Sequence, residues 1–222
     1  MQTPTINKYF PLLCVIQTCA KSFTASAVTT EQYSLKTYYE IKRICKELNI
    51  VPDVIAQAPK HLIEIAYNKV DYVDFGNYLT VDQIKREPTL VRWPRSPELL
   101  YTLMLISPDY PTRENPIYKE WQYWLVTNSL GGDLELAETM TEYSPPTEIP
   151  GNEPCRMIFL AFTQRTEHIV NFTEPRHSKE VICEERANFK AANFAYKYNF
   201  PELTAINYFL IKPTNSTPAI FL

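Results

Sequence analysis

The sequence predicts a mostly β protein with a few peripheral α-helices, and three observations support this fold class. The 222 residues include 18 Pro, 15 Tyr and 11 Phe but only 4 Gly. Tyr and Phe favour strands, whereas Pro favours the turns between them. From residue 60 onward, short apolar runs alternate with clusters of Pro, Asn, Asp and Ser, which is the pattern of successive strands and loops.

Five apolar runs are the expected strands. Three of them are continuous, which predicts strands that are buried on both faces. The five runs cover residues 62–67, 100–106, 121–126, 157–162 and 208–211. A helix is expected over residues 189–198, between Asn188 and the helix-breaking Pro201.

The segment before the strands predicts an amphipathic helix of about 17 residues. Thr29 and Gln32 fit a capping box, and Asn49 and Pro52 end the helix. Apolar residues follow at helical spacing, namely Tyr38, Ile41, Ile44, Cys45 and Leu48. We interpret this stripe as facing the core rather than as binding a partner.

The N-terminus has the pattern of a secretory signal peptide. Lys8 precedes a short apolar run at 9–16, and Ala25-Ser26-Ala27 supplies a cleavage pattern. The run is too short to span a bilayer, so no transmembrane segment is expected. The alternative is an apolar strand or a disordered tail in a cytoplasmic protein. We expect a secreted chain with three parts: a signal peptide at 1–27, a helical extension at 28–49 and a single domain at 50–222.

Two sequons predict N-glycosylation of a secreted chain, at Asn171 and Asn215. Pro218 follows the second sequon and weakens it. Cleavage after residue 27 leaves Cys45, Cys155 and Cys183. Because three is an odd number, at least one thiol is expected to be free or intermolecular.

Several function classes are disfavoured. The net charge of −3 argues against nucleic acid as a partner, and four glycines form no phosphate-binding loop. There is no GxSxG motif and no CxxC pair, and His168, His177 and Cys183 match no standard metal site. A reactive Cys155 would need a nearby cation, but Arg156 should point to the opposite face of its strand. We therefore expect no enzyme activity, no metal and no cofactor.

The most informative segment is the turn at 106–116, which follows a buried strand. It holds three prolines, and its Asp109 and Arg113 are close enough in sequence to pair. Prolines make such a turn rigid. A rigid turn can position a ligand or can close a corner of a sandwich, and the residues alone favour the corner.

Three motifs in order resemble those of the phosphatidylethanolamine-binding protein family, also called the Raf kinase inhibitor family. The turn 107–113 (SPDYPTR) is similar to D-P-D-x-P-[SG]-R, and residues 120–128 (EWQYWLVTN) are similar to E-W-x-H-[WF]-L-V-x-N. Residues 145–157 resemble the P-P…G-x-x-x-H-R-Y block. The resemblance covers about residues 45–212 and is nearest to the antennal and secreted branch. It implies a large β-sandwich with a small pocket for phosphate-like groups at one end.

This sequence departs from the family pattern at the pocket. Ser107 replaces an Asp, Tyr123 and Cys155 replace histidines, and Met157 replaces a Tyr. By the resemblance, the pocket is lined by Ser107, Tyr123, Pro145, Cys155, Met157 and Tyr208. The scaffold around it comprises Pro108, Asp109, Pro111, Arg113 and Arg156.

Such a pocket is neutral, so we expect weak phosphate binding at most. The first hypothesis is a monomeric, non-enzymatic binding protein for a small ligand, a lipid headgroup or an odorant-like molecule. The pocket could equally be filled and closed. The second hypothesis is an interaction module or inhibitor of a kinase or protease, acting through the loops at 131–148 or 167–181. A protease is the more sensible target if the chain is secreted.

Overall fold

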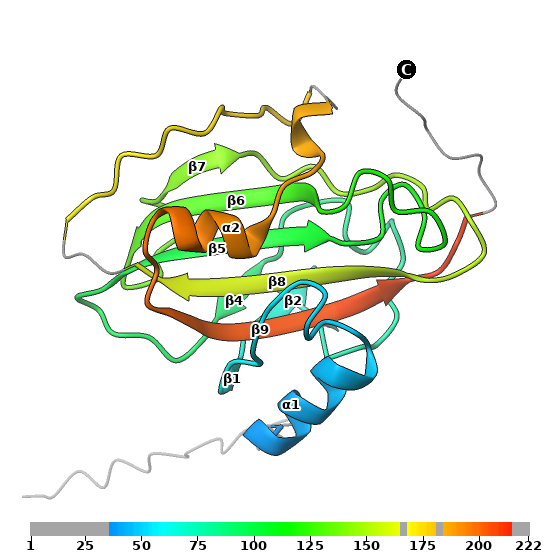
Figure 1. Cartoon of the computed structure of the whole chain (residues 1–222), viewed down its shortest axis with the longest axis horizontal. Helices are drawn as coiled ribbons and strands as arrows, with labels where there is room; N and C mark the ends of the chain where they lie inside the picture. The colour runs from blue at the N-terminus through cyan, green and yellow to red at the C-terminus, as the bar shows by residue number, and fades with distance from the viewer. Residues whose placement is uncertain (1–35, 165–167, 181–183, 215–222) are drawn as a thin grey trace, which may run out of the picture. The chain divides into compact units, whose positions relative to one another are not determined.

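A six-stranded sheet runs through the computed structural model, which describes residues 36–164, 168–180 and 184–214 (Figure 1). These residues lie in one unit of the chain, Tyr33–Leu222, and the other unit, Met1–Gln32, is outside the described residues. The strand order in this sheet is β1-β9-β8-β5-β6-β7. Its strands are β1 (His61–Leu62), β5 (Leu100–Ser107), β6 (Trp121–Leu130), β7 (Glu138–Thr141), β8 (Cys155–Thr163) and β9 (Glu202–Ile211).

A smaller sheet packs on one face of the large one. It has the order β3-β2-β4, with β2 (Glu64–Tyr67), β3 (Asp71–Tyr72) and β4 (Leu90–Arg92). Residues of β5 alternate between two hydrophobic clusters: Leu103 and Leu105 face the small sheet, whereas Met104 and Ile106 face the helices. Both faces of the large sheet are therefore buried, which explains its continuous apolar runs. The fold is mostly β, as predicted.

The predicted strand at 62–67 is two strands. Leu62 ends β1, which pairs in parallel with β9, and Glu64 begins β2, which belongs to the small sheet. The chain changes sheets at Ile63, which is fully buried. The apolar pattern of 62–67 does not reveal such a crossing, because it carries no record of which strands pair with each residue.

Helix α1 (Tyr38–Glu47) begins later than predicted. Thr37 is its N-cap: the Thr37 Oγ1 accepts from the Glu40 backbone N–H, and the Glu40 carboxylate accepts from the Thr37 N–H at 2.7 Å. The predicted capping box at Thr29 and Gln32 is therefore wrong as the start of this helix, and both residues lie outside the described ones. Thr37 and Glu40 have the same spacing, and a carboxylate is the stronger acceptor. Ile41 and Cys45 are buried in the cluster on the large sheet, and Ile44 and Leu48 pack against it, so this part of the stripe faces the core as predicted. Tyr38, the first residue of the predicted stripe, is instead 47% exposed.

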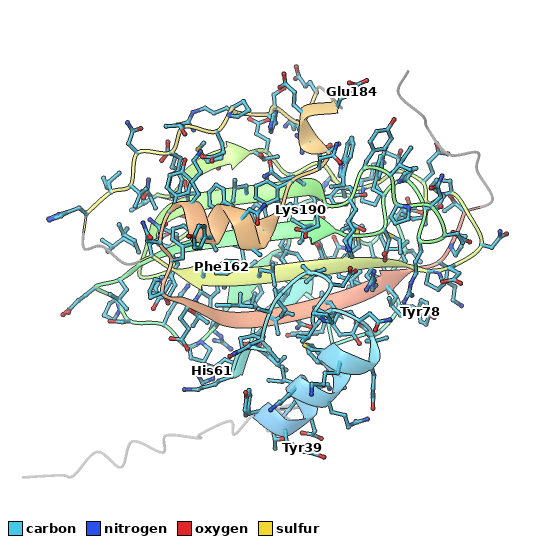
Figure 2. The ribbon with its side chains drawn as sticks, in the orientation of Figure 1. Tyr39, His61, Tyr78, Phe162, Glu184 and Lys190 are labelled. Carbon is cyan, nitrogen blue, oxygen red and sulfur yellow. The ribbon has the colours of Figure 1, made fainter. Side chains whose placement is uncertain are left out.

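Helix α2 (Ala191–Lys197) covers the same face of the sheet and is shorter than the expected 189–198. Figure 2 shows Phe162 of β8 beneath it. Phe194 of α2 stacks on Phe172 with a centroid distance of 5.5 Å. The 3₁₀ turn η1 (Glu184–Arg186) precedes α2. No helix among the described residues is long and apolar enough to cross a membrane.

Candidate functional site

A cavity of about 250 Å³ lies at the end of the sandwich where β5 ends and β6 and β8 begin. The turn after β5 supplies Tyr110 and Pro111, and β6 supplies Trp121 and Tyr123. The remaining lining residues come from the loop after β7 and from η1, namely Ser144, Pro145, Pro146, Thr147, Glu148, Pro150 and Arg186. Thus four segments of the chain form one site.

One wall of the cavity is aromatic. The rings of Tyr110 and Trp121 stack with centroids 3.9 Å apart, and Tyr118 meets Trp121 edge-on at 6.5 Å. Burial raises the pKa of Tyr110, and the neighbouring Tyr118 and Glu148 raise it further. The phenol therefore stays protonated at neutral pH, and this wall presents an uncharged surface.

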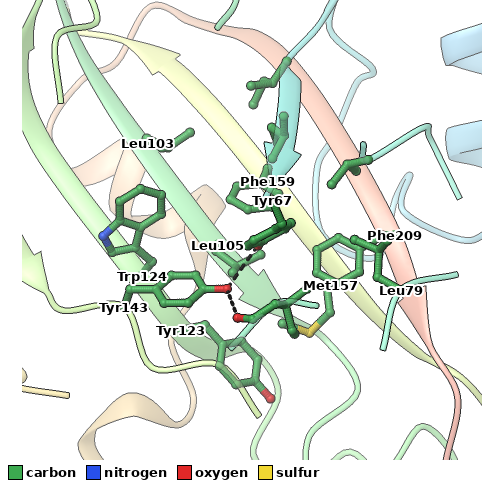
Figure 3. Close-up of a cluster of buried hydrophobic side chains, with 14 of the residues drawn as sticks. Tyr67, Leu79, Leu103, Leu105, Tyr123, Trp124, Tyr143, Met157, Phe159 and Phe209 are labelled. Atoms are coloured by element: carbon green, nitrogen blue, oxygen red, sulfur yellow. Dashed lines mark hydrogen bonds between the residues drawn. The ribbon is translucent and has the colours of Figure 1, made fainter. Parts of the chain in front are cut away.

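The hydroxyl group of Tyr123 is one of the buried polar groups beside the cavity. The side chain is 2% exposed, and its Oη has no hydrogen-bond partner among the described residues. Figure 3 shows this hydroxyl pointing away from the hydrogen-bonded pair of Tyr67 and Tyr143. Burial raises the pKa of Tyr123 well above its usual value, so the group is a neutral donor and acceptor. A buried hydroxyl without a partner is unfavourable, so this group retains an unused capacity for one hydrogen bond.

Ser107 and Cys155 bind each other instead of lining the cavity. The Ser107 Oγ and Cys155 Sγ lie 3.1 Å apart, and the Ser107 Oγ also accepts from the Asp109 N–H at 3.0 Å. Burial raises the pKa of Cys155 to about 12. The thiol is therefore protonated and unreactive at neutral pH.

The structure does not bring the six predicted pocket residues together. Tyr123 and Pro145 line the cavity, and Met157 is buried in the cluster between the sheets. Tyr208 lies on the opposite face of the large sheet, where it meets Phe75 at 4.9 Å. This placement corrects the prediction for Tyr208. On β9, Phe209 pairs with Met157 and points to the same face, so its neighbour Tyr208 must point away.

The scaffold residues form a buried ion pair beneath the turn. Arg156 Nη2 lies 2.6 Å from Asp109 Oδ1, and the Arg156 backbone N–H donates to Asp109 Oδ2 at 2.8 Å. Arg156 also donates to the Leu48 carbonyl at the end of α1. The suggested pairing of Asp109 with Arg113 is wrong, because Arg113 is half-exposed and lies 3.6 Å from Glu153. Pro111 lines the cavity, whereas Pro108 lies beside the ion pair.

Two kinds of lining residue were missed by sequence reasoning. Tyr110 and Trp121 stand inside the quoted motifs, and their aromatic character was the available signal. Arg186 gave no signal: it is 1% exposed, and its guanidinium donates to the carbonyls of Gln122 at 3.2 Å and Ser178 at 2.7 Å. Only the tertiary fold places it in the wall.

The remaining predicted sites are surface or terminal features. Asn171 is exposed in the segment after β8. Asn215 and the predicted signal peptide at 1–27 lie outside the described residues. In the described part of the chain, no three His, Cys, Asp or Glu side chains are placed to hold a metal ion.

Comparisons with known proteins place this fold. No protein-family model matches the sequence. The chain is 30% identical over 169 residues to a Drosophila melanogaster protein provisionally named odorant-binding protein A5, which covers 76% of this chain and 79% of that protein. The structure is similar to a phosphatidylethanolamine-binding protein from Plasmodium vivax, with a TM-score of 0.67, 20% identity and coverage of 81% and 99% of the two chains. It is also similar to a carboxypeptidase Y inhibitor solved with its cognate proteinase, with a TM-score of 0.66, 18% identity and coverage of 80% and 97%. The chain belongs to the phosphatidylethanolamine-binding protein family.

Proposed function

We propose that this protein is a non-enzymatic carrier that binds a small, uncharged and mostly apolar molecule in the cavity beside Tyr110 and Trp121. The observation that carries this proposal is the buried hydroxyl of the lining residue Tyr123, which has no hydrogen-bond partner among the described residues. A ligand with one hydroxyl or carbonyl group would satisfy it, while the stacked rings and prolines would hold the apolar part. The name of the Drosophila relative, an odorant-binding protein, agrees with such a ligand.

The size and charge of the cavity limit the ligand. A volume of about 250 Å³ is below the roughly 300–1,000 Å³ that drug-sized molecules occupy. No histidine lines the cavity, and the guanidinium of Arg186 is engaged by backbone carbonyls. The carboxylate of Glu148 adds negative charge at the rim. Free phosphate and phospholipid headgroups should therefore bind weakly at most.

Two matched ligands test the proposal. Acetophenone and ethylbenzene have similar shapes, but only acetophenone offers a carbonyl group. Displacement of a fluorescent apolar probe, N-phenyl-1-naphthylamine, should show tighter binding of acetophenone. Tyr123→Phe should weaken acetophenone by about five- to tenfold, as expected for one hydrogen bond, and should leave ethylbenzene unchanged. Inorganic phosphate should not displace the probe.

Failure of both aromatic ligands and of the probe to bind would overturn the carrier proposal. Displacement by millimolar phosphate would instead show that the anion function is retained. The competing hypothesis, an inhibitor that acts through loops, has weaker support, because the inhibitor of known structure is only 18% identical. Equal inhibition of a protease by the wild type and by Tyr123→Phe would support the inhibitor hypothesis.

We also propose that the protein is secreted after removal of residues 1–27. The A-x-A pattern at 25–27 and the exposed sequon at Asn171 support this proposal. Mass spectrometry of the chain from secreting cells should find an N-terminus at Val28 and a glycan on Asn171. A full-length, unmodified chain retained inside the cells would overturn it.

A further inference from the structure

A groove of about 690 Å³, separate from the cavity, opens at the side of the sandwich. Val91 of β4 and Thr89, just before β4, line one side of it. Trp124 and Val126 of β6 and Thr139 of β7 also line it. The loop at 132–135 forms its remaining side. The small sheet has three strands and the large sheet has six, so the small sheet does not cover the whole face of the large one. The groove lies where β4, the last strand of the small sheet, leaves β6 and β7 of the large sheet uncovered.

The strand β4 has one backbone edge that carries no other strand in the described part of the chain. It pairs with β2 alone, in the register Glu64 with Arg92 and Ala66 with Leu90. An edge of this kind presents N–H and C=O groups that an extended segment of another chain can pair with. The edge is three residues long, so it can add a short strand.

The floor and rim of the groove differ in chemistry. The partly buried Val91 and Leu134 supply apolar surface beside Trp124, which is 5% exposed, and Leu136, two residues beyond Leu134, is 87% exposed. The rim carries three exposed carboxylates, Glu87, Asp133 and Glu135. None of the three forms an ion pair with a described residue. The Asp133 carboxylate accepts the Glu135 backbone N–H at 2.9 Å.

Among the described residues, Arg95 is the cation that lines the groove, and its surroundings engage it. Arg95 lies over the ring of Trp93 at 5.6 Å and donates to the Gly132 carbonyl at 2.6 Å. This holds its charge at one end of the groove. Among the described residues that line the groove, three carboxylates therefore outnumber one guanidinium.

We propose that this groove binds an extended cationic segment of a partner protein, which adds a strand to the free edge of β4. Side chains of a strand alternate in direction. A segment that alternates Lys or Arg with aliphatic residues can therefore place its charges on the acidic rim and its apolar side chains on the floor. The inference does not depend on a ligand in the cavity.

Isothermal titration with three synthetic peptides tests this inference. Ac-Lys-Val-Lys-Val-Lys-NH2 should bind, whereas Ac-Glu-Val-Glu-Val-Glu-NH2 and Ac-Lys-Gly-Lys-Gly-Lys-NH2 should bind at least fivefold more weakly. These controls remove the charge complementarity and the apolar contacts in turn. Amide shifts in a ¹⁵N spectrum should cluster at residues 89–92 and 132–135.

Two double variants separate the rim from general charge effects. Glu87→Gln with Glu135→Gln should weaken the lysine–valine peptide at least fivefold. Glu184→Gln with Glu185→Gln makes the same charge change on η1, from which Glu184 projects in Figure 2, and should leave binding unchanged. Equal binding of the three peptides, equal loss in both variants, or shifts that map elsewhere would each overturn the proposal. The rim variant should keep the wild-type ¹⁵N spectrum at residues away from the groove, which confirms that it is folded.

Discussion

The carboxylate of Glu120 accepts a hydrogen bond of 2.9 Å from the backbone N–H of Ala191, the first residue of α2. Glu120 directly precedes β6 and is 2% exposed, and its backbone exchanges two hydrogen bonds of 3.0 Å with Phe189. Burial raises its pKa to about 7, although the Ala191 N–H and the charges of Lys190 and Lys119 lower it. Asp53 raises it further. One titratable group thus joins the start of β6 to α2.

Glu120→Gln should flatten the pH dependence of stability. The ordinary carboxyl pKa is 4.5, so the folded state holds the proton more tightly than the unfolded state. The resulting stabilisation is fully present below pH 4.5 and is lost as the pH rises to 7, with a size of at most about 3 kcal/mol. Urea unfolding of the wild type and the variant at pH 5 and pH 8 measures it. Subtracting the unfolding free energy of the variant from that of the wild type removes the contribution of other titrating groups such as His177. Equal pH slopes in the two proteins would contradict the raised pKa of Glu120.

Asp109→Ala should destabilise the protein strongly. It leaves the buried guanidinium of Arg156 without the carboxylate that lies 2.6 Å away, and breaking a buried pair in this way costs about 3–5 kcal/mol. Urea unfolding followed by tryptophan fluorescence gives the change. Arg113→Ala is the control, because Arg113 and Glu153 form a half-exposed pair at 3.6 Å that should contribute less than about 1 kcal/mol. Similar losses in the two variants would refute this division.

Cys155 and Cys45 should resist alkylation in the folded protein. Burial raises the pKa of both thiols to about 12, so almost no thiolate forms at pH 8. Peptide mass spectrometry after iodoacetamide treatment should find both residues unmodified in buffer and modified in guanidinium chloride. Rapid labelling of native Cys155 would mean that the thiol is accessible, and would reopen its exclusion as a nucleophile.

Gly76→Ala should destabilise the protein by about 1–3 kcal/mol, the usual range for overpacking. Gly76 has a φ of +113°, and a Cβ there would overlap the Tyr208 hydroxyl and lie 2.8 Å from its Cζ. Tyr208→Phe removes the hydroxyl and should recover part of the loss. A double-mutant cycle by thermal unfolding measures this coupling. Additive effects of the two substitutions would show that strain at φ alone is responsible.

Residue patterns alone predicted the buried strands and the family. The runs at 100–106, 121–126 and 157–162 are continuous because the large sheet is covered on both faces, by the small sheet and by the helices. Such runs are a local property of the chain. They therefore identify β5, β6 and β8 without any knowledge of how the strands pair.

Only the tertiary structure decided the composition of the cavity. The pairing of β8 with β9 puts Phe209 opposite Met157 and so turns Tyr208 to the other face, and a shift of one residue in register would reverse this. Ser107 and Cys155 are 48 residues apart, and they meet because β5 and β8 pair antiparallel, which puts the end of β5 beside the beginning of β8. Arg186 reaches the wall through hydrogen bonds to carbonyls of β6. Such contacts depend on which backbones meet in space, and a residue's neighbours in sequence carry no record of that.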